Sequence, residues 1–185
     1  MPSRNFDFFS PMNTIPPMRF FPFFYKQPNY WTCGPAVARL ILHSFGQKKT
    51  FPEIIRETKT TKAGTSNRDL KRVLKKHGVG FKEKQNASLS EIKSKIKTHW
   101  LVVAYWIPVH REAHYSLIKK IDTKRVYFHD TWFGANHSYT HRHFLKNWWD
   151  GEAKKWLLAV KKPNKLIAWG FRGTYPALSK NIRKY

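Results

Sequence analysis

The hydrophobic pattern of the chain changes midway, and this change limits the folds available to it more than any other feature. Up to about residue 98 apolar residues recur at helical spacing, whereas β-branched and aromatic residues then form short runs between turn signals. Helices followed by antiparallel strands are typical of an α+β fold. A length of 185 residues suits one domain with a sizeable core. The runs that predict strands are residues 100–107, 113–121, 125–130 and 155–162.

Four helices are predicted in the first half of the chain. The first begins at Cys33, tolerates Pro35 in its opening turn, and stops at Gly46. The second follows a capping-box pattern of Thr50 and Glu53. All four predicted helices occupy the segments near residues 33–45, 50–55, 66–78 and 88–97.

The folded domain is predicted to occupy residues 26–162. Residues 1–25 are rich in aromatic residues and proline and form an irregular lead-in, while residues 163–185 form a basic tail. The lead-in lacks the apolar core of a signal peptide, and no window approaches the roughly 20 apolar residues of a membrane span. We therefore expect a cytoplasmic protein. A single cysteine excludes an internal disulfide and a zinc site built on cysteine pairs.

The chain is strongly basic, with 35 Lys and Arg residues against 11 Asp and Glu and a formal net charge of +24. Such a charge predicts attraction to nucleic acid, to an anionic membrane or to an acidic partner. A solvated basic surface without a specific partner explains the charge equally well. Because the basic residues are spread along the chain and form no single arm, the charge assigns no chemistry.

The only cysteine, Cys33, stands at the predicted N-terminus of the first helix. There the helix dipole and unpaired backbone N–H groups favour a thiolate, which is the nucleophilic form of the side chain. This position alone leaves open a buried and inert cysteine. Gln27 stands six residues upstream, and its side-chain N–H together with a backbone N–H could stabilise an oxyanion beside the thiol.

A predicted hairpin in the second half brings a histidine and an aspartate together. His114 and Asp130 stand symmetrically about a turn at residues 122–124. If the turn centres on Asp122, the two residues lie directly opposite each other on neighbouring strands. A register that differs by one residue would place them on different faces of the sheet. On the same face this register also predicts four neighbours: Ser116, Ile118, Val126 and Phe128.

Taken together, Gln27, Cys33, His114 and Asp130 supply every part of a thiol acyl-transfer apparatus. The glutamine polarises the carbonyl, the cysteine attacks it, the histidine moves the proton and the aspartate fixes the imidazole tautomer. The sequence therefore predicts an enzyme that acts on acyl groups through a cysteine.

At these residues the chain resembles the papain-like cysteine peptidases, in particular cysteine peptidase family 39, which includes peptidases that cut bacteriocin leader peptides after a double glycine. The resemblance covers roughly residues 26–160 and implies a papain-like α+β fold, in which the helix that carries the cysteine packs on an antiparallel sheet. It implies a peptide or protein substrate and no cofactor or metal. The segments that carry it are QPNYWTCGPAVARLIL, GTSNRDLKRVLKKHGV, AHYSLIKKIDTKRVYFHDTWFG and HFLKNWW.

The resemblance implies a role for each candidate residue. Cys33 would be the nucleophile, His114 the base, Asp130 the residue that orients the imidazole, and Gln27 the oxyanion donor. The family commonly has a proline after this aspartate, whereas here Thr131 follows it.

Three other features are interpreted separately. His137, His141 and His143 have no carboxylate or thiol beside them, so their segment is predicted to be a solvated loop in preference to a metal site. The tryptophans of NWWDG, residues 147–151, are predicted to lie in the core. The net charge supports a second hypothesis, a non-catalytic basic module of the same fold that binds nucleic acid or an acidic protein. An acidic substrate would also account for the charge.

Overall fold

The computed structural model describes residues 25–163. The predictions for the lead-in and for the basic tail therefore lie outside the described residues. The secondary-structure elements follow one another as η1 (Tyr30–Thr32), α1 (Cys33–Ser44), α2 (Phe51–Glu57), α3 (Asn67–Lys76), β1 (Phe81–Lys84), α4 (Leu89–Lys95), β2 (His99–Ile107), β3 (Glu112–Ile121), β4 (Arg125–Asp130), β5 (Gly134–Thr140), α5 (His141–Asn147) and β6 (Leu157–Lys161).

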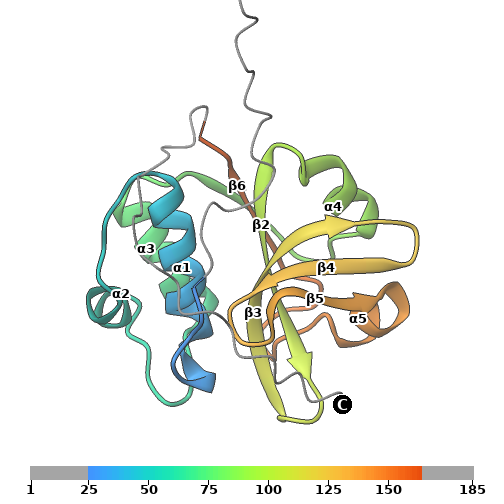
Figure 1. The fold of residues 1–185 in the computed structure, drawn as a ribbon, viewed down its shortest axis with the longest axis horizontal. Helices are drawn as coiled ribbons and strands as arrows, with labels where there is room; N and C mark the ends of the chain where they lie inside the picture. The colour runs from blue at the N-terminus through green and yellow to red at the C-terminus, as the bar shows by residue number, and fades with distance from the viewer. Residues whose placement is uncertain (1–24, 164–185) are drawn as a thin grey trace, which may run out of the picture.

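A six-stranded antiparallel sheet in the order β1-β6-β2-β3-β4-β5 forms the centre of the molecule. Figure 1 shows α1, α2 and α3 on one side of this sheet and α4 and α5 on the other. Both sides of the central strands are therefore buried, which explains why β2 is a nearly continuous apolar run in the sequence. The α+β architecture, with the cysteine helix packed on an antiparallel sheet, is confirmed.

The two faces of the sheet belong to two separate hydrophobic cores. Beneath α1, α2 and α3 the first core alternates along β2 through Trp100, Val102 and Ala104. Beneath α4 and α5 the second core takes the intervening residues Leu101 and Val103. The alternation follows from the period of two in a strand, which sends successive side chains to opposite faces.

The residues predicted to start and end the helices do so in the structure. In α1 the C-terminal turn is followed by Gly46 at φ +77°, the left-handed conformation that glycine adopts at no steric cost. Before α2, Thr50 and Glu53 form the capping box. Before α3, the Ser66 hydroxyl accepts a hydrogen bond of 3.1 Å from the backbone N–H of Asp69.

The sequence does not predict four of the elements, η1, β1, β5 and α5. The solvated loop predicted for the three histidines is wrong, because His137 lies in β5 while His141 and His143 lie in α5. With half-buried and exposed residues throughout, the edge strand β5 lacks the apolar alternation that identifies a strand. Phe144 of α5 stacks at 4.7 Å on Trp148, the residue directly after this helix, in the second core, so one of the two adjacent tryptophans lies where it was predicted.

The register predicted for the β3–β4 hairpin is also wrong. Leu117 pairs with His129, which places Ser116, not His114, across from Asp130. The turn is shifted because the Asp122 carboxylate accepts hydrogen bonds from the backbone N–H groups of Lys124 and Arg125, at 2.9 and 2.8 Å. A bulge between Ile118 and Lys120 absorbs the remaining offset.

The faces predicted for this hairpin are nevertheless right. Ile118, Val126 and Phe128 share the second core, on the same face as Ser116. His114 remains on the face of Asp130 because the register error is an even number of residues.

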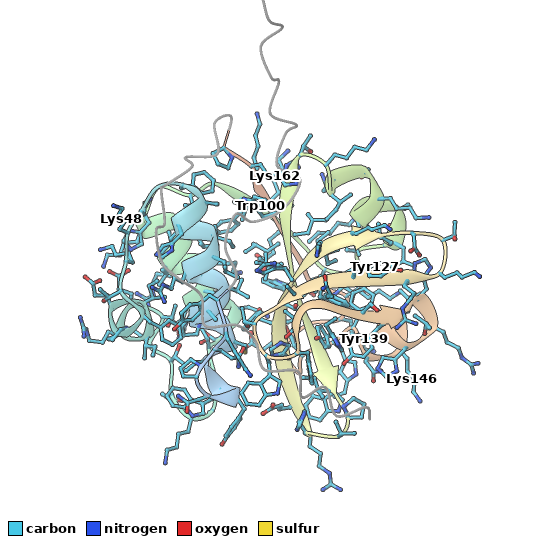
Figure 2. The ribbon with its side chains drawn as sticks, in the orientation of Figure 1. Lys48, Trp100, Tyr127, Tyr139, Lys146 and Lys162 are labelled. Carbon is cyan, nitrogen blue, oxygen red and sulfur yellow. The ribbon has the colours of Figure 1, made fainter. Side chains whose placement is uncertain are left out.

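Basic side chains lie on several sides of the molecule. Figure 2 shows Lys48 on the helical side, Lys146 on the opposite side and Lys162 near Trp100. The Lys162 Nζ lies 4.4 Å from the centroid of the Trp100 ring, which is a cation–π distance. None of the helices between residues 25 and 163 combines the length and the apolar character that a membrane crossing requires.

Candidate active site

Cys33 is the first residue of α1 and is 5% exposed. The residue after it must be glycine, because a Cβ on Gly34 would lie 2.6 Å from both Cβ and Oγ1 of Thr65. The Thr65 hydroxyl is in turn hydrogen-bonded to that of Thr60, at 2.6 Å. Close packing of the loop before α3 against the start of α1 therefore fixes the position of the cysteine.

His114 on β3 and Asp130 at the end of β4 form a buried pair. The imidazole Nε2 lies 3.1 Å from Oδ1 and 3.0 Å from Oδ2 of the carboxylate. The two residues are 2% and 0% exposed. Because Nε2 faces the carboxylate, Nδ1 is the ring nitrogen that remains for the cysteine. Cys33 lies close enough to the His114 ring to raise the pKa of the histidine, in addition to the larger effects of burial and of Asp130.

The Asp130 carboxylate is held by four groups. Besides His114 it accepts hydrogen bonds from the Tyr105 hydroxyl, at 3.0 Å, and from the backbone N–H groups of Trp132 and Phe133, both at 2.8 Å. Tyr105 pairs directly with His114 across β2 and β3, and the two rings meet edge to face at 5.6 Å. The carboxylate therefore has little freedom to rotate, and it fixes the orientation of the imidazole.

The pKa values of the pair diverge strongly. Burial alone would lower the pKa of His114, but the charge and hydrogen bond of Asp130, with a contribution from Cys33, raise it to about 10. Burial alone would raise the pKa of Asp130, but His114 and the two backbone N–H groups hold it well below its usual range. At neutral pH the pair consists of an imidazolium and a carboxylate.

Gln27 links two segments of the site and is 2% exposed. Its side-chain Nε2 donates to the backbone carbonyls of Asn29, at 2.7 Å, and Tyr30, at 3.1 Å, in the turn that leads into Cys33. Its Oε1 accepts a hydrogen bond of 2.7 Å from the Thr131 hydroxyl. The structure therefore brings Cys33, His114 and Asp130 together and attaches Gln27 to both sides of this group.

A groove with a volume of about 620 Å³ opens beside the cysteine, and Cys33 and His114 both line it. Tyr115 also lines it, and its hydroxyl donates a hydrogen bond of 2.6 Å to Asn67. Counting the imidazolium of His114, four of its charged side chains are basic and four are acidic, so the groove does not share the basic excess of the chain. The four acidic residues are Asp69, Glu112, Asp150 and Glu152.

Sequence reasoning missed the residues that support the site. Tyr105 occupies a buried position of an apolar strand, where a tyrosine is normally part of the core. In the sequence Thr131 stands out only as a departure from a family pattern. Neither residue has a local sequence signal for its role, because each acts on a residue more than 20 positions away.

Between residues 25 and 163 the structure contains no group of three or more His, Cys, Asp or Glu side chains arranged to hold a metal. His137 stacks on Phe133 at 4.6 Å, and His143 stacks on Tyr139 at 4.4 Å. These histidines pack against aromatic rings.

Solved structures with the same fold are peptidase domains. The chain aligns with a C39-like peptidase from Bacillus anthracis at a TM-score of 0.63 and 13% identity, covering 80% of this chain and 98% of that one. It aligns with the peptidase domain of Streptococcus ComA, a bi-functional ABC transporter of a quorum-sensing pathway, at 0.62 and 17%, covering 75% and 97%. A double glycine motif protease from an AMS/PCAT transporter, solved with the leader peptide, gives 0.60 and 13%, covering 76% and 91%.

At these identities the solved structures establish the fold, and the family follows from the sequence. No curated protein sequence matches the chain. A model of the peptidase C39 family matches residues 24–163, which include all the described elements. The chain therefore belongs to the peptidase C39 family.

Proposed function

We propose that the chain is a cysteine peptidase in which Cys33, His114 and Asp130 form the catalytic triad. The observation that carries this proposal is the continuous chain of buried contacts from the cysteine through the imidazole to the carboxylate, with the groove open on the cysteine side. An imidazolium beside the sulfur stabilises a thiolate by its charge. The arrangement is that of a cysteine nucleophile with a base beside it.

The proposed reaction follows the triad order. The Cys33 sulfur attacks the carbonyl carbon of a peptide bond, forming a C–S bond and a tetrahedral oxyanion. His114 then gives its proton to the amine nitrogen as the C–N bond breaks, which leaves an acyl-enzyme. A water molecule loses a proton to His114 and attacks the acyl carbon, and the C–S bond then breaks with the sulfur leaving as a thiolate, which restores the pair of thiolate and imidazolium. Throughout, Asp130 keeps Nε2 of the imidazole engaged and so directs Nδ1 towards the sulfur.

In this proposal Gln27 supplies an oxyanion donor. Its Nε2 group already points towards the turn that precedes Cys33, where it donates to two backbone carbonyls. When the oxyanion forms, one N–H turns from a neutral carbonyl to a charged oxygen, which accepts a stronger hydrogen bond. Donors of this kind contribute about 3–4 kcal/mol each to transition-state stabilisation.

The substrate class we propose is a peptide or a protein segment. One protein of the same fold was solved with the leader peptide bound, and the groove of this chain is large enough for several residues of extended peptide. Because acidic side chains are as common in the groove as basic ones, the groove itself does not select for an acidic substrate.

The test is the rate at which iodoacetamide alkylates Cys33 near pH 7. We expect the wild-type protein to react at least about tenfold faster than glutathione, and His114→Ala to lose this advantage, because alkylation requires the thiolate. His43→Ala is the matched control, since His43 lies in the last turn of α1, at the end opposite Cys33. Mass spectrometry of the labelled peptide identifies the modified residue.

Equal rates in the wild type and in His114→Ala would end the catalytic proposal. Retention on nucleic acid that depends on salt and is unaffected by Cys33→Ala would then support the basic binding module. The present observations favour the enzyme, because a module that only binds has no need of a buried imidazolium and carboxylate beside its cysteine.

A further inference from the structure

Thr131 is fully buried and makes two hydrogen bonds with Gln27. Its hydroxyl donates to the glutamine Oε1 at 2.7 Å, and its backbone carbonyl accepts from the glutamine N–H at 2.9 Å. A single residue therefore holds both the backbone and the side chain of Gln27.

These contacts determine which end of the amide faces the cysteine turn. The Thr131 hydroxyl donates to Oε1, while the carbonyls of Asn29 and Tyr30 accept from Nε2. A flipped amide would place Oε1 against two carbonyl oxygens, where no proton is available. Removal of the hydroxyl would leave Oε1 buried without a donor, and the energetic cost of this unsatisfied acceptor would favour a different orientation of the amide.

Thr131 is itself fixed by the catalytic carboxylate. It directly follows Asp130, whose Oδ1 accepts hydrogen bonds from the N–H groups of the two residues after Thr131, Trp132 and Phe133. This turn closes over Thr131 and restricts its backbone. Asp130, which orients the imidazole, and Thr131, which anchors the glutamine amide, are thus consecutive residues of one turn.

We propose that Thr131 is a positioning residue that holds the Gln27 amide with its N–H groups facing the turn before Cys33, from which one of them can turn to the oxyanion. This inference rests on the proposed function, in which Gln27 is the oxyanion donor. Loss of a complete oxyanion donor lowers the rate about 10²–10³-fold. Loss of the anchor leaves the donor present but displaced, so we expect a rate about tenfold lower, all of it in steps that form an oxyanion.

Two reactions of the same cysteine separate this role from a structural one. Acylation by p-nitrophenyl acetate passes through a tetrahedral oxyanion, whereas alkylation by iodoacetamide displaces iodide and forms none. Thr131→Val removes the hydroxyl and keeps the shape of the side chain. We expect it to acylate about tenfold more slowly than the wild type and to be alkylated within about twofold of the wild-type rate. Thr131→Ser should restore acylation to within about twofold.

Three further variants complete the experiment. Ser44→Ala removes another buried hydroxyl, which bonds the Ile41 carbonyl at the far end of α1, and should change neither rate. Gln27→Ala should slow acylation about 100-fold, and adding Thr131→Val to it should have no further effect, because the amide to be positioned is gone. Thr131→Ala differs from Thr131→Ser only by the hydroxyl, so this pair replaces the valine variant if that variant does not fold.

The outcomes distinguish this inference from the function on which it rests. If the wild-type protein shows no acylation that depends on Cys33, the proposed function fails and the positioning role fails with it. If the wild type is acylated and Thr131→Val matches it, only the positioning role is overturned. Equal losses in acylation and alkylation, or no restoration by Thr131→Ser, would likewise overturn it in favour of a purely structural residue.

Discussion

Replacement of Asp130 by asparagine removes the negative charge of the triad and leaves its shape intact. The amide oxygen can still accept from the backbone N–H groups of Trp132 and Phe133, which bond Oδ1 of the carboxylate. The Tyr105 hydroxyl, which donates to Oδ2, can rotate to accept from the new amide N–H. The change therefore tests the charge of the carboxylate separately from its packing.

The magnitude follows from the pKa of His114. With Asp130 ionised this pKa is about 10, and without that charge burial should take it below the ordinary value of 6.5. His129 on β4 shows the strength of burial in this sheet, because desolvation lowers its pKa to about 4. The imidazolium would then fall from nearly complete to less than about a quarter at pH 7. An unassisted thiol is only about 3% thiolate there, so alkylation should slow about 10- to 30-fold.

The assay is the second-order rate of iodoacetamide alkylation of Asp130→Asn and the wild type, near pH 7 and near pH 9. The wild-type His114 stays protonated over this range, because its pKa of about 10 lies above it. The ratio of the two rates should shrink to less than about threefold near pH 9, where an ordinary thiol ionises unaided. Asp122→Asn serves as the control, since Asp122 also accepts backbone N–H bonds but in the distant turn between β3 and β4. A ratio below twofold near pH 7, or one that does not change with pH, would refute the reasoning.

Three other predictions concern stability. Tyr105→Phe removes one donor from the Asp130 carboxylate and should lower the free energy of unfolding in urea by about 1.5–3 kcal/mol. A change under about 0.5 kcal/mol would show that this hydrogen bond does not stabilise the fold. Gly34→Ala should cost about 1–3 kcal/mol, and Thr65→Gly, but not Thr65→Ala, should restore stability, because the Thr65 Cβ itself lies 2.6 Å from the new atom. The pKa of His114 in the folded protein, about 10, exceeds its ordinary value of 6.5. Its ion pair with Asp130 therefore stabilises the fold fully below about pH 6.5, and this contribution is lost as pH rises through about 10. The difference in the free energy of unfolding in urea between the wild type and Asp130→Asn should accordingly shrink from pH 7 to pH 10.

The elements that the sequence predicted are those whose signals are local. A helix start such as Thr50 with Glu53, or a run such as β2, is specified within a few residues and needs no knowledge of its neighbours. Edge strands β1 and β5 carry no such signal, since their residues are mostly exposed or half-buried and the sheet recruits them by backbone hydrogen bonds. Their formation depends on a neighbouring strand that local sequence cannot place.

The residues of the candidate site also differ in whether a local sequence signal identifies them. Cys33, Gln27, His114 and Asp130 could be found because each has a chemically distinctive side chain in an order that resembles a known family. Tyr105, Thr65 and Thr131 could not, because a tyrosine in a strand and a threonine in a loop are common and acquire their roles only through partners distant in sequence. The side chains of the proposed triad can thus be predicted from the sequence, whereas the residues that position them cannot.

The His114–Asp130 pair shows how an incorrect register still led to a correct contact. The predicted turn centred on Asp122, whereas the observed pairing of Leu117 with His129 displaces the strands by two residues. A shift of two keeps every side chain on its face, so His114 meets Asp130 along a diagonal, with Nε2 still 3.0 Å from Oδ2. A shift of one would have sent the two residues to opposite cores. The sequence pattern therefore specifies reliably the face of the sheet on which a residue lies, and the histidine side chain is long enough to span the remaining offset of two residues.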